Sequence, residues 1–182
     1  LLVGLFVATV VFHFANRISR EREQLATHDT LTGLPNRMLF KDRLEQSLIR
    51  AQRHQTLVGV MFIDIDRFKR VNDTLGHASG DQLIREVARR LRQTVRSDDV
   101  VARLGGDEFV VVINDVVALN PILQVVEKML AAVTEPYRLS GREIFSSCSI
   151  GVSTYPNDGI TSADLLKHAD TAMYHAKNSG RN

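Results

Sequence analysis

The hydrophobic pattern along the chain predicts four strands. Apolar and often β-branched residues form nearly unbroken runs, which is typical of buried strands. The runs cover residues 57–63, 100–104, 109–113 and 144–152. Only the segment GGDE at 105–108 separates the second run from the third, which predicts that these two strands form a hairpin.

Apolar residues at intervals of three and four predict helices around these strands. Asn36 follows a proline and can cap a first helix, while Thr161 and Asp164 form a capping box for a last helix that ends near Gly180. Two further stretches with helical period cover residues 81–95 and 121–133.

The order of elements without the flanking helices is β-α-β-β-α-β, which predicts an α+β fold with a ferredoxin-like or palm-type sheet. A right-handed crossover makes the first and second strands parallel, so the hairpin turn lies at the edge where the first strand ends. The third strand lies against the first in this fold. Asp107 and Glu108 are therefore expected close to Asp64 and Asp66, so that four carboxylates converge.

The first 15 residues are apolar and uncharged, and three arginines follow at positions 17, 20 and 22. Fifteen helical residues are about 22 Å long, which is less than the roughly 30 Å hydrocarbon core of a bilayer. We interpret residues 1–15 as the C-terminal part of a transmembrane helix, with a buried N-terminal helix as the alternative. The arginines favour the cytoplasmic side, which predicts anchoring in the inner (cytoplasmic) membrane with the rest of the chain in the cytoplasm.

Residues 16–27 are interpreted as a helical signalling linker between this segment and a domain at 28–182. Phe14, Ile18 and Leu25 are spaced by four and seven residues with charges between them, which is a weak heptad pattern. A parallel coiled-coil connector and a solvated helix explain this pattern equally well.

The composition of the 182-residue chain excludes several classes of protein. With 44% hydrophobic and 24% charged residues, the chain can bury a core and is neither disordered nor collagen-like. A net charge of +2 is too small for electrostatic nucleic-acid binding, so no nucleic-acid partner is expected. The single cysteine, Cys148, excludes an internal disulfide framework and favours a reducing compartment.

Carboxylates gathered at a sheet edge repel one another unless cations or protons intervene, and oxygen ligands select hard ions such as Mg²⁺ or Mn²⁺. The alternative is a loop of solvated acids. Metal sites of this kind usually serve phosphoryl chemistry. The chain contains no P-loop or Rossmann glycine motif, so Lys177 and Arg181 near the end of the last helix are the candidate phosphate ligands. The alternative is that these cations only complement the dipole at the C-terminus of the helix. These residues predict a metal-dependent enzyme acting on a phosphorylated substrate.

Six sequence blocks in a fixed order carry a family resemblance. They are DTLTGLPNR at 29–37, FIDIDRFKRVND at 62–73, GHASGD at 76–81, RLGGDEF at 103–109, SIGVS at 149–153 and ADTAMYHAKNSGRN at 169–182. Together they resemble the GGDEF-domain diguanylate cyclases, which join two GTP molecules into cyclic di-GMP. The resemblance covers about residues 29–182. Because the family normally continues into a final strand, the chain is expected to lack that edge of its sheet.

Matched position by position, the resemblance implies a metal centre. Asp64, the backbone carbonyl of Ile65 and Asp107 would hold two Mg²⁺ or Mn²⁺ ions per active site. Glu108 would assist metal binding or deprotonate the 3′-hydroxyl.

The resemblance also implies contacts to GTP. Asn72 and Asp81 would read guanine, whose adjacent N1–H and N2–H₂ donors suit a carboxylate. The alternative role for Asp81 is the N-cap of the following helix, and the two roles are compatible. His77 lies in the GHASGD block, where a structural role is favoured over a catalytic one. The positions that match phosphate contacts are Phe68, Lys69, Lys177 and Arg181.

Arg96 and Asp99 form an RxxD motif with five residues between Asp99 and Gly105. This spacing resembles the family's inhibitory product site, where arginine and aspartate would bind cyclic di-GMP. The alternative is an exposed ion pair, which contributes little.

The resemblance as a whole implies a diguanylate cyclase that condenses two GTP into cyclic di-GMP and two pyrophosphates. Because each domain offers half a site, catalysis would need a homodimer with twofold symmetry. One alternative is a catalytically silent GGDEF-like domain that senses GTP or cyclic di-GMP. Another is a structural signalling module that binds no nucleotide.

Overall fold

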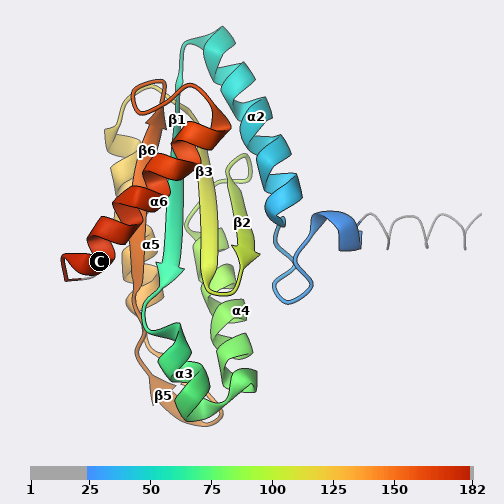
Figure 1. Cartoon of the computed structure of the whole chain (residues 1–182), viewed down its shortest axis with the longest axis vertical. Coiled ribbons are helices and arrows are strands. Elements are labelled where there is room, and N and C mark those ends of the chain that lie inside the picture. The colour runs from blue at the N-terminus through green and yellow to red at the C-terminus, as the bar shows by residue number, and fades with distance from the viewer. Residues whose placement is uncertain (1–23, 181–182) are drawn as a thin grey trace, which may run out of the picture.

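Four strands form one antiparallel sheet in the spatial order β2-β3-β1-β6 (Figure 1). The computed structural model describes residues 24–180. The strands are β1 (Leu57–Ile65), β2 (Val100–Gly105), β3 (Glu108–Val116) and β6 (Cys148–Tyr155). β1 pairs with both β3 and β6, which confirms that the first apolar run is a central strand. This strand order is the one that the predicted β-α-β-β-α-β topology requires.

Helices cover both faces of the sheet (Figure 1). Val60 and Phe62 of β1 pack with α2 (Arg37–His54) and α6 (Ser162–Asn178), whereas Met61 and Ile63 pack with the helices of the opposite face. Those helices are α4 (His77–Gln93) and α5 (Asn120–Thr134). Successive side chains of a strand point to opposite faces, so β1 contributes to two cores at once.

The predicted helix caps are present. The Asn36 side chain accepts hydrogen bonds from the backbone N–H groups of Met38 and Leu39 at the start of α2. At the start of α6, Thr161 Oγ1 accepts from the Asp164 N–H at 3.1 Å and donates to its carboxylate at 2.7 Å. These contacts satisfy backbone donors that lack partners at a helix N-terminus.

Three elements differ from the prediction. α3 (Phe68–Leu75) was not predicted, because it is only 8 residues long and none of its residues is fully buried. α4 begins at His77 rather than 81, because its first turn carries small and polar residues. The predicted strand at 144–152 starts too early: β6 begins only at Cys148, and Ile144 ends β5 (Arg142–Ile144), which pairs with β4 (Tyr137–Leu139) in a separate two-stranded sheet that was not predicted.

The predicted membrane segment at 1–15 and most of the predicted linker at 16–27 lie outside the described residues. Residues 24–27 at the end of that linker are helical. Within residues 24–180, no helix combines the length and the apolar character that a membrane span requires. The membrane segment and the coiled-coil linker therefore stay predictions.

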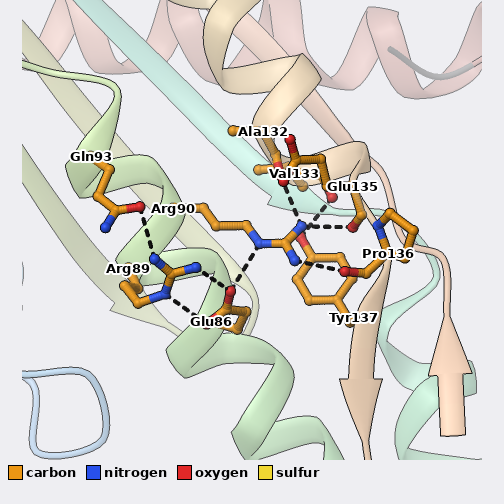
Figure 2. A network of polar contacts seen from close by, with 9 residues as sticks. All are labelled: Glu86, Arg89, Arg90, Gln93, Ala132, Val133, Glu135, Pro136 and Tyr137. Atoms are coloured by element: carbon orange, nitrogen blue, oxygen red, sulfur yellow. Dashed lines mark hydrogen bonds and ion pairs between the residues drawn. The ribbon is translucent and has the colours of Figure 1, made fainter.

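A buried arginine joins α4 to the end of α5 (Figure 2). The Arg90 guanidinium donates to the backbone carbonyls of Ala132 at 2.9 Å, Glu135 at 2.6 Å and Pro136 at 2.8 Å. It also binds Glu86 at 3.0 Å and lies 3.9 Å from the centre of the Tyr137 ring. Because the last carbonyls of a helix have no partner within the helix, this one side chain caps α5 and fixes the start of β4.

Acidification is expected to weaken this region. Hydrogen bonds from Arg89 and Arg90 to the Glu86 carboxylate lower its pKa from 4.5 to about 2, although burial acts in the opposite direction. The folded pKa is below the unfolded one, so the contribution of Glu86 to stability is present above pH 4.5 and is lost as the pH falls toward 2. Urea denaturation between pH 7 and pH 3 should therefore show a shallower acid loss in Glu86→Gln than in the wild type. Equal acid losses would contradict this assignment.

Candidate active site

The hairpin turn lies beside the end of β1, as predicted. Asp64 faces Glu108 across the β1–β3 ladder, and the Ile65 N–H donates to the Asp107 carbonyl at 3.3 Å. Gly105 and Gly106 form the turn with φ angles of +137° and +53°, a conformation that residues with a Cβ rarely adopt. Antiparallel pairing and a glycine turn thus bring Asp64, Asp107 and Glu108 to one edge of the sheet.

Asp64 is the buried acid of this edge. Burial is the main cause that raises the pKa of Asp64, the charges of Asp107 and Glu108 raise it further, and Lys177 opposes both. Lys177 Nζ of α6 lies 2.6 Å from Asp64 Oδ1 as an ion pair, but this oxygen accepts no hydrogen bond of good geometry. An acceptor that is buried, charged and incompletely satisfied, with two further carboxylates nearby, fits a divalent cation.

Asp66 does not belong to this group, so the expectation of four converging carboxylates is wrong. Its two oxygens accept hydrogen bonds from Ser147 Oγ at 2.5 Å and Ser149 Oγ at 2.8 Å, which tie the end of β1 to the start of β6. β1 ends at Ile65, so the rule that alternate residues share one side no longer applies at position 66. Within residues 24–180, no three Asp, Glu, His or Cys side chains are grouped closely enough to hold a metal by themselves.

Asn72 of α3 and Asp81 of α4 come from two helices that pack against each other. Asn72 Oδ1 is buried without a hydrogen-bond partner and lies against Gly80, the residue before Asp81. Asp81 is exposed and is the fifth residue of α4, whose N-cap is Gly76. The alternative that Asp81 caps this helix is therefore wrong.

The candidate phosphate ligands are only partly described. Lys177 lies at Asp64, as stated above. Phe68 and Lys69 form the first turn of α3, directly after the end of β1, and the Lys69 side chain is exposed. His77 is exposed at the start of α4. Arg181 lies outside the described residues.

A clamp between two sequence blocks was missed by the sequence analysis. Arg103 Nη1 binds both oxygens of Asp29 at 3.0 and 2.9 Å, and its Nε and Nη2 atoms donate to the Gly106 carbonyl at 3.1 and 2.8 Å. Burial acts to raise the pKa of Asp29, but hydrogen bonds from Thr32 and Arg103 outweigh it and lower that pKa. The clamp fixes the glycine turn to residues 29–37. The sequence shows no sign of this contact beyond one charged residue in each block, because the two partners are 74 positions apart.

The RxxD motif forms a structured turn rather than an exposed ion pair. Asp99 is buried, and its carboxylate accepts hydrogen bonds from the backbone N–H groups of Arg96 at 3.1 Å and Asn114 at 3.0 Å. Arg92 donates to the Arg96 carbonyl at 2.9 Å. The Arg96 side chain is exposed. Asp99 thus anchors the turn, and the turn presents Arg96 to solvent.

Comparison with known protein families gives one extensive match. The family described as "Diguanylate cyclase, GGDEF domain" matches residues 26–182. The bifunctional diguanylate cyclase/cyclic di-GMP phosphodiesterase MucR of Pseudomonas aeruginosa is 50% identical over 168 residues, which are 91% of this chain. The chain spans only 24% of the length of MucR.

Solved structures resemble this fold over nearly their whole length. A structure of the GGDEF domain of TpbB from Pseudomonas aeruginosa is 44% identical with a TM-score of 0.83, and the match covers 85% of this chain and 90% of that one. The coiled coil and GGDEF domain of DgcB from Caulobacter crescentus, in complex with c-di-GMP, is 27% identical with a TM-score of 0.86. That match covers 98% of this chain and 95% of the DgcB chain.

Proposed function

Because this chain belongs to the GGDEF-domain family of diguanylate cyclases, we propose that it condenses two GTP molecules into cyclic di-GMP and two pyrophosphates. The observation that carries the proposal is the position of the buried Asp64 carboxylate beside the hairpin turn. Acidic groups in this arrangement suit a nucleotidyl transfer that uses divalent cations.

The proposed metal ligands are Asp64, the Ile65 carbonyl and Asp107, with assistance from Glu108. Mg²⁺ usually binds one or two protein carboxylates together with water and substrate phosphates, so a set of few protein ligands suits it. Bound here, two Mg²⁺ or Mn²⁺ ions would neutralise charge on the phosphates and activate the attacking oxygen. Lys177, next to Asp64, would bind phosphate oxygens at the same edge, together with Arg181.

The guanine would lie between α3 and α4. The exposed Asp81 carboxylate can accept from N1–H and N2–H₂ of guanine together, whereas adenine lacks this pair of donors. Asn72 lies on the neighbouring helix α3, against Gly80 of α4, and its amide would contact the same base. Phe68 and Lys69 would lie along the phosphates, and His77 would support the start of α4.

The reaction needs two copies of the site. Each 3′-oxygen attacks the α-phosphate of the opposing GTP, a new P–O bond forms, and pyrophosphate leaves in line. Glu108 would accept the 3′-hydroxyl proton. Since the ring has twofold symmetry, two domains must face each other as a homodimer. The structure of DgcB, which joins a coiled coil to a GGDEF domain, supports residues 16–27 as the element that pairs two chains. Residues 1–15 would attach this dimer to the cytoplasmic membrane.

Product feedback is proposed at the RxxD turn. The exposed Arg96 guanidinium can stack on guanine and bind phosphate, while the buried Asp99 carboxylate holds the turn in shape through the N–H groups of Arg96 and Asn114. Arg96→Ala is expected to raise the cyclic di-GMP concentration that halves activity at least about tenfold, because one charge-assisted contact is lost. Initial-rate assays with added product measure this, with Ser97→Ala as the neighbouring control. Unchanged product inhibition in Arg96→Ala would remove the regulatory role.

The proposed function is tested by product identification. The chain is dimerised through an N-terminal fusion and incubated with GTP and Mg²⁺. The nucleotides are then separated and identified by mass spectrometry. Cyclic di-GMP with two pyrophosphates per ring supports the cyclase. Tight binding of GTP or cyclic di-GMP without turnover would instead identify a catalytically silent sensor. A chain that binds no nucleotide would be a structural signalling module.

A further inference from the structure

Gly80 lies in the first turns of α4, where it faces α3. A Cβ built at this position would overlap Asn72 Oδ1 and would lie 3.0 Å from Asn72 Cγ and 3.2 Å from Phe68 Cζ. These three nearest neighbours are all side-chain atoms. The space beside Gly80 is therefore filled by the Asn72 amide.

The backbone does not require glycine at position 80. Gly80 has no positive φ angle, whereas Gly76 at the start of the same helix has a φ of +82°. Alanine is also the better helix former. Gly151 is different in kind, because a Cβ there would overlap main-chain atoms of α6 at Ala169 and Met173. At Gly80 only side chains would have to move.

The Asn72 amide is held in an orientation that is unfavourable without a ligand. Its Oδ1 is buried and has no hydrogen-bond partner, which costs free energy. Asn72 as a whole is only half-buried, so the residue still borders the solvent. The close approach of the helices at Gly80 thus sets the direction in which this amide points.

We propose that Gly80 is a positioning residue for guanine recognition. Because it has no side chain, it leaves the space that holds the Asn72 amide beside Asp81. This inference rests on the proposed binding of GTP between α3 and α4. In Gly80→Ala the methyl group occupies the place of Asn72 Oδ1, and the amide must rotate away. The fold is kept, because the side chains of Asn72 and Phe68 can move without the backbone.

The expected signature separates recognition from folding. Gly80→Ala should bind GTP about tenfold more weakly, the loss expected for one displaced hydrogen bond, while its melting temperature stays equal to or above that of the wild type. Asn72→Ala should weaken binding similarly. Because both changes act on the same amide, the double variant should bind no more weakly than Asn72→Ala alone.

The experiment measures binding of a non-hydrolysable GTP analogue with Mg²⁺ by calorimetry for the wild type, both single variants and the double variant. Arg85→Ala, an exposed change on α4, is the control. The side-chain amide resonance of Asn72, recorded by NMR without nucleotide, should shift in Gly80→Ala and not in Arg85→Ala.

The proposal would be overturned by unchanged GTP affinity in Gly80→Ala, by losses that add in the double variant, or by an unmoved Asn72 resonance. A lower melting temperature of Gly80→Ala would also overturn it, because the glycine would then serve the backbone. If the wild type itself binds no GTP, the proposed function fails and the role of Gly80 in recognition fails with it. The two failures are thus distinguished by the wild-type titration.

Discussion

Asp107→Ala is expected to lower cyclic di-GMP synthesis by about a thousandfold or more while the domain stays folded. The loss follows from removal of a proposed metal ligand, since metal stabilisation is worth several kcal/mol and each 1.36 kcal/mol changes a rate tenfold. Asp107 lies in the hairpin turn and is only half-buried, so its side chain contributes little to packing. Its charge also helps to raise the pKa of Asp64, so the variant relieves repulsion at the buried carboxylate.

The measurement is the initial rate of product formation from GTP and Mg²⁺, together with a thermal melt of the same samples. Asp73→Ala serves as the matched control, because it removes an exposed acid from α3. The control should keep its activity, and both variants should melt near the wild-type temperature. Full activity in a folded Asp107→Ala protein would refute the metal role of this residue.

Arg90→Ala is expected to lower the free energy of unfolding by about 3 kcal/mol, the range found when a buried charged partner is removed. The change leaves one backbone carbonyl in the last turn of α5 and two directly after the helix without their donor, and it takes away the cation above the Tyr137 ring (Figure 2). Urea denaturation monitored by circular dichroism measures the loss. The free energy of unfolding of Arg90→Lys should lie between those of the wild type and Arg90→Ala, because an ammonium group cannot reach all these oxygens as the planar guanidinium does.

Arg89 provides an internal control for this effect. It binds the same Glu86 carboxylate and also Gln93, but its side chain is exposed and it makes no hydrogen bond to α5. Arg89→Ala should therefore change the stability little, as is usual for an exposed ion pair. Equal losses in Arg89→Ala and Arg90→Ala would show that the Glu86 ion pair, and not the cap on α5, stabilises the domain.

The sequence was sufficient to predict the order of the strands and which residues lie near one another at the edge of the sheet where β1 ends. Buried strands leave long apolar runs, and the handedness of crossovers then places the turn at 105–108 beside the end of β1. That Asp64 lies close to Glu108 follows from these two rules, whereas the direct pairing of the two residues was seen only in the structure. Local rules also suffice for the caps at Asn36 and Thr161, whose partners are two and three residues away.

Features that depend on distant partners could not be predicted. Asp66 reads like Asp64 in the sequence, but its serine donors lie 81 and 83 positions further along the chain. Arg90 looks like one of several surface arginines of a charged helix until the end of α5 is placed on it. α3 escapes detection for another reason, because it packs at the margin of the domain and no residue in it is fully buried.

The central claim is that the end of β1 and the hairpin turn together hold a divalent cation with GTP. Mn²⁺ titration followed by electron paramagnetic resonance tests this directly, with a non-hydrolysable GTP analogue present and the Asp107→Ala protein as the comparison. The account predicts that the wild type with nucleotide removes Mn²⁺ from the free pool and that Asp107→Ala removes far less. Equal Mn²⁺ binding by the two folded proteins would contradict it.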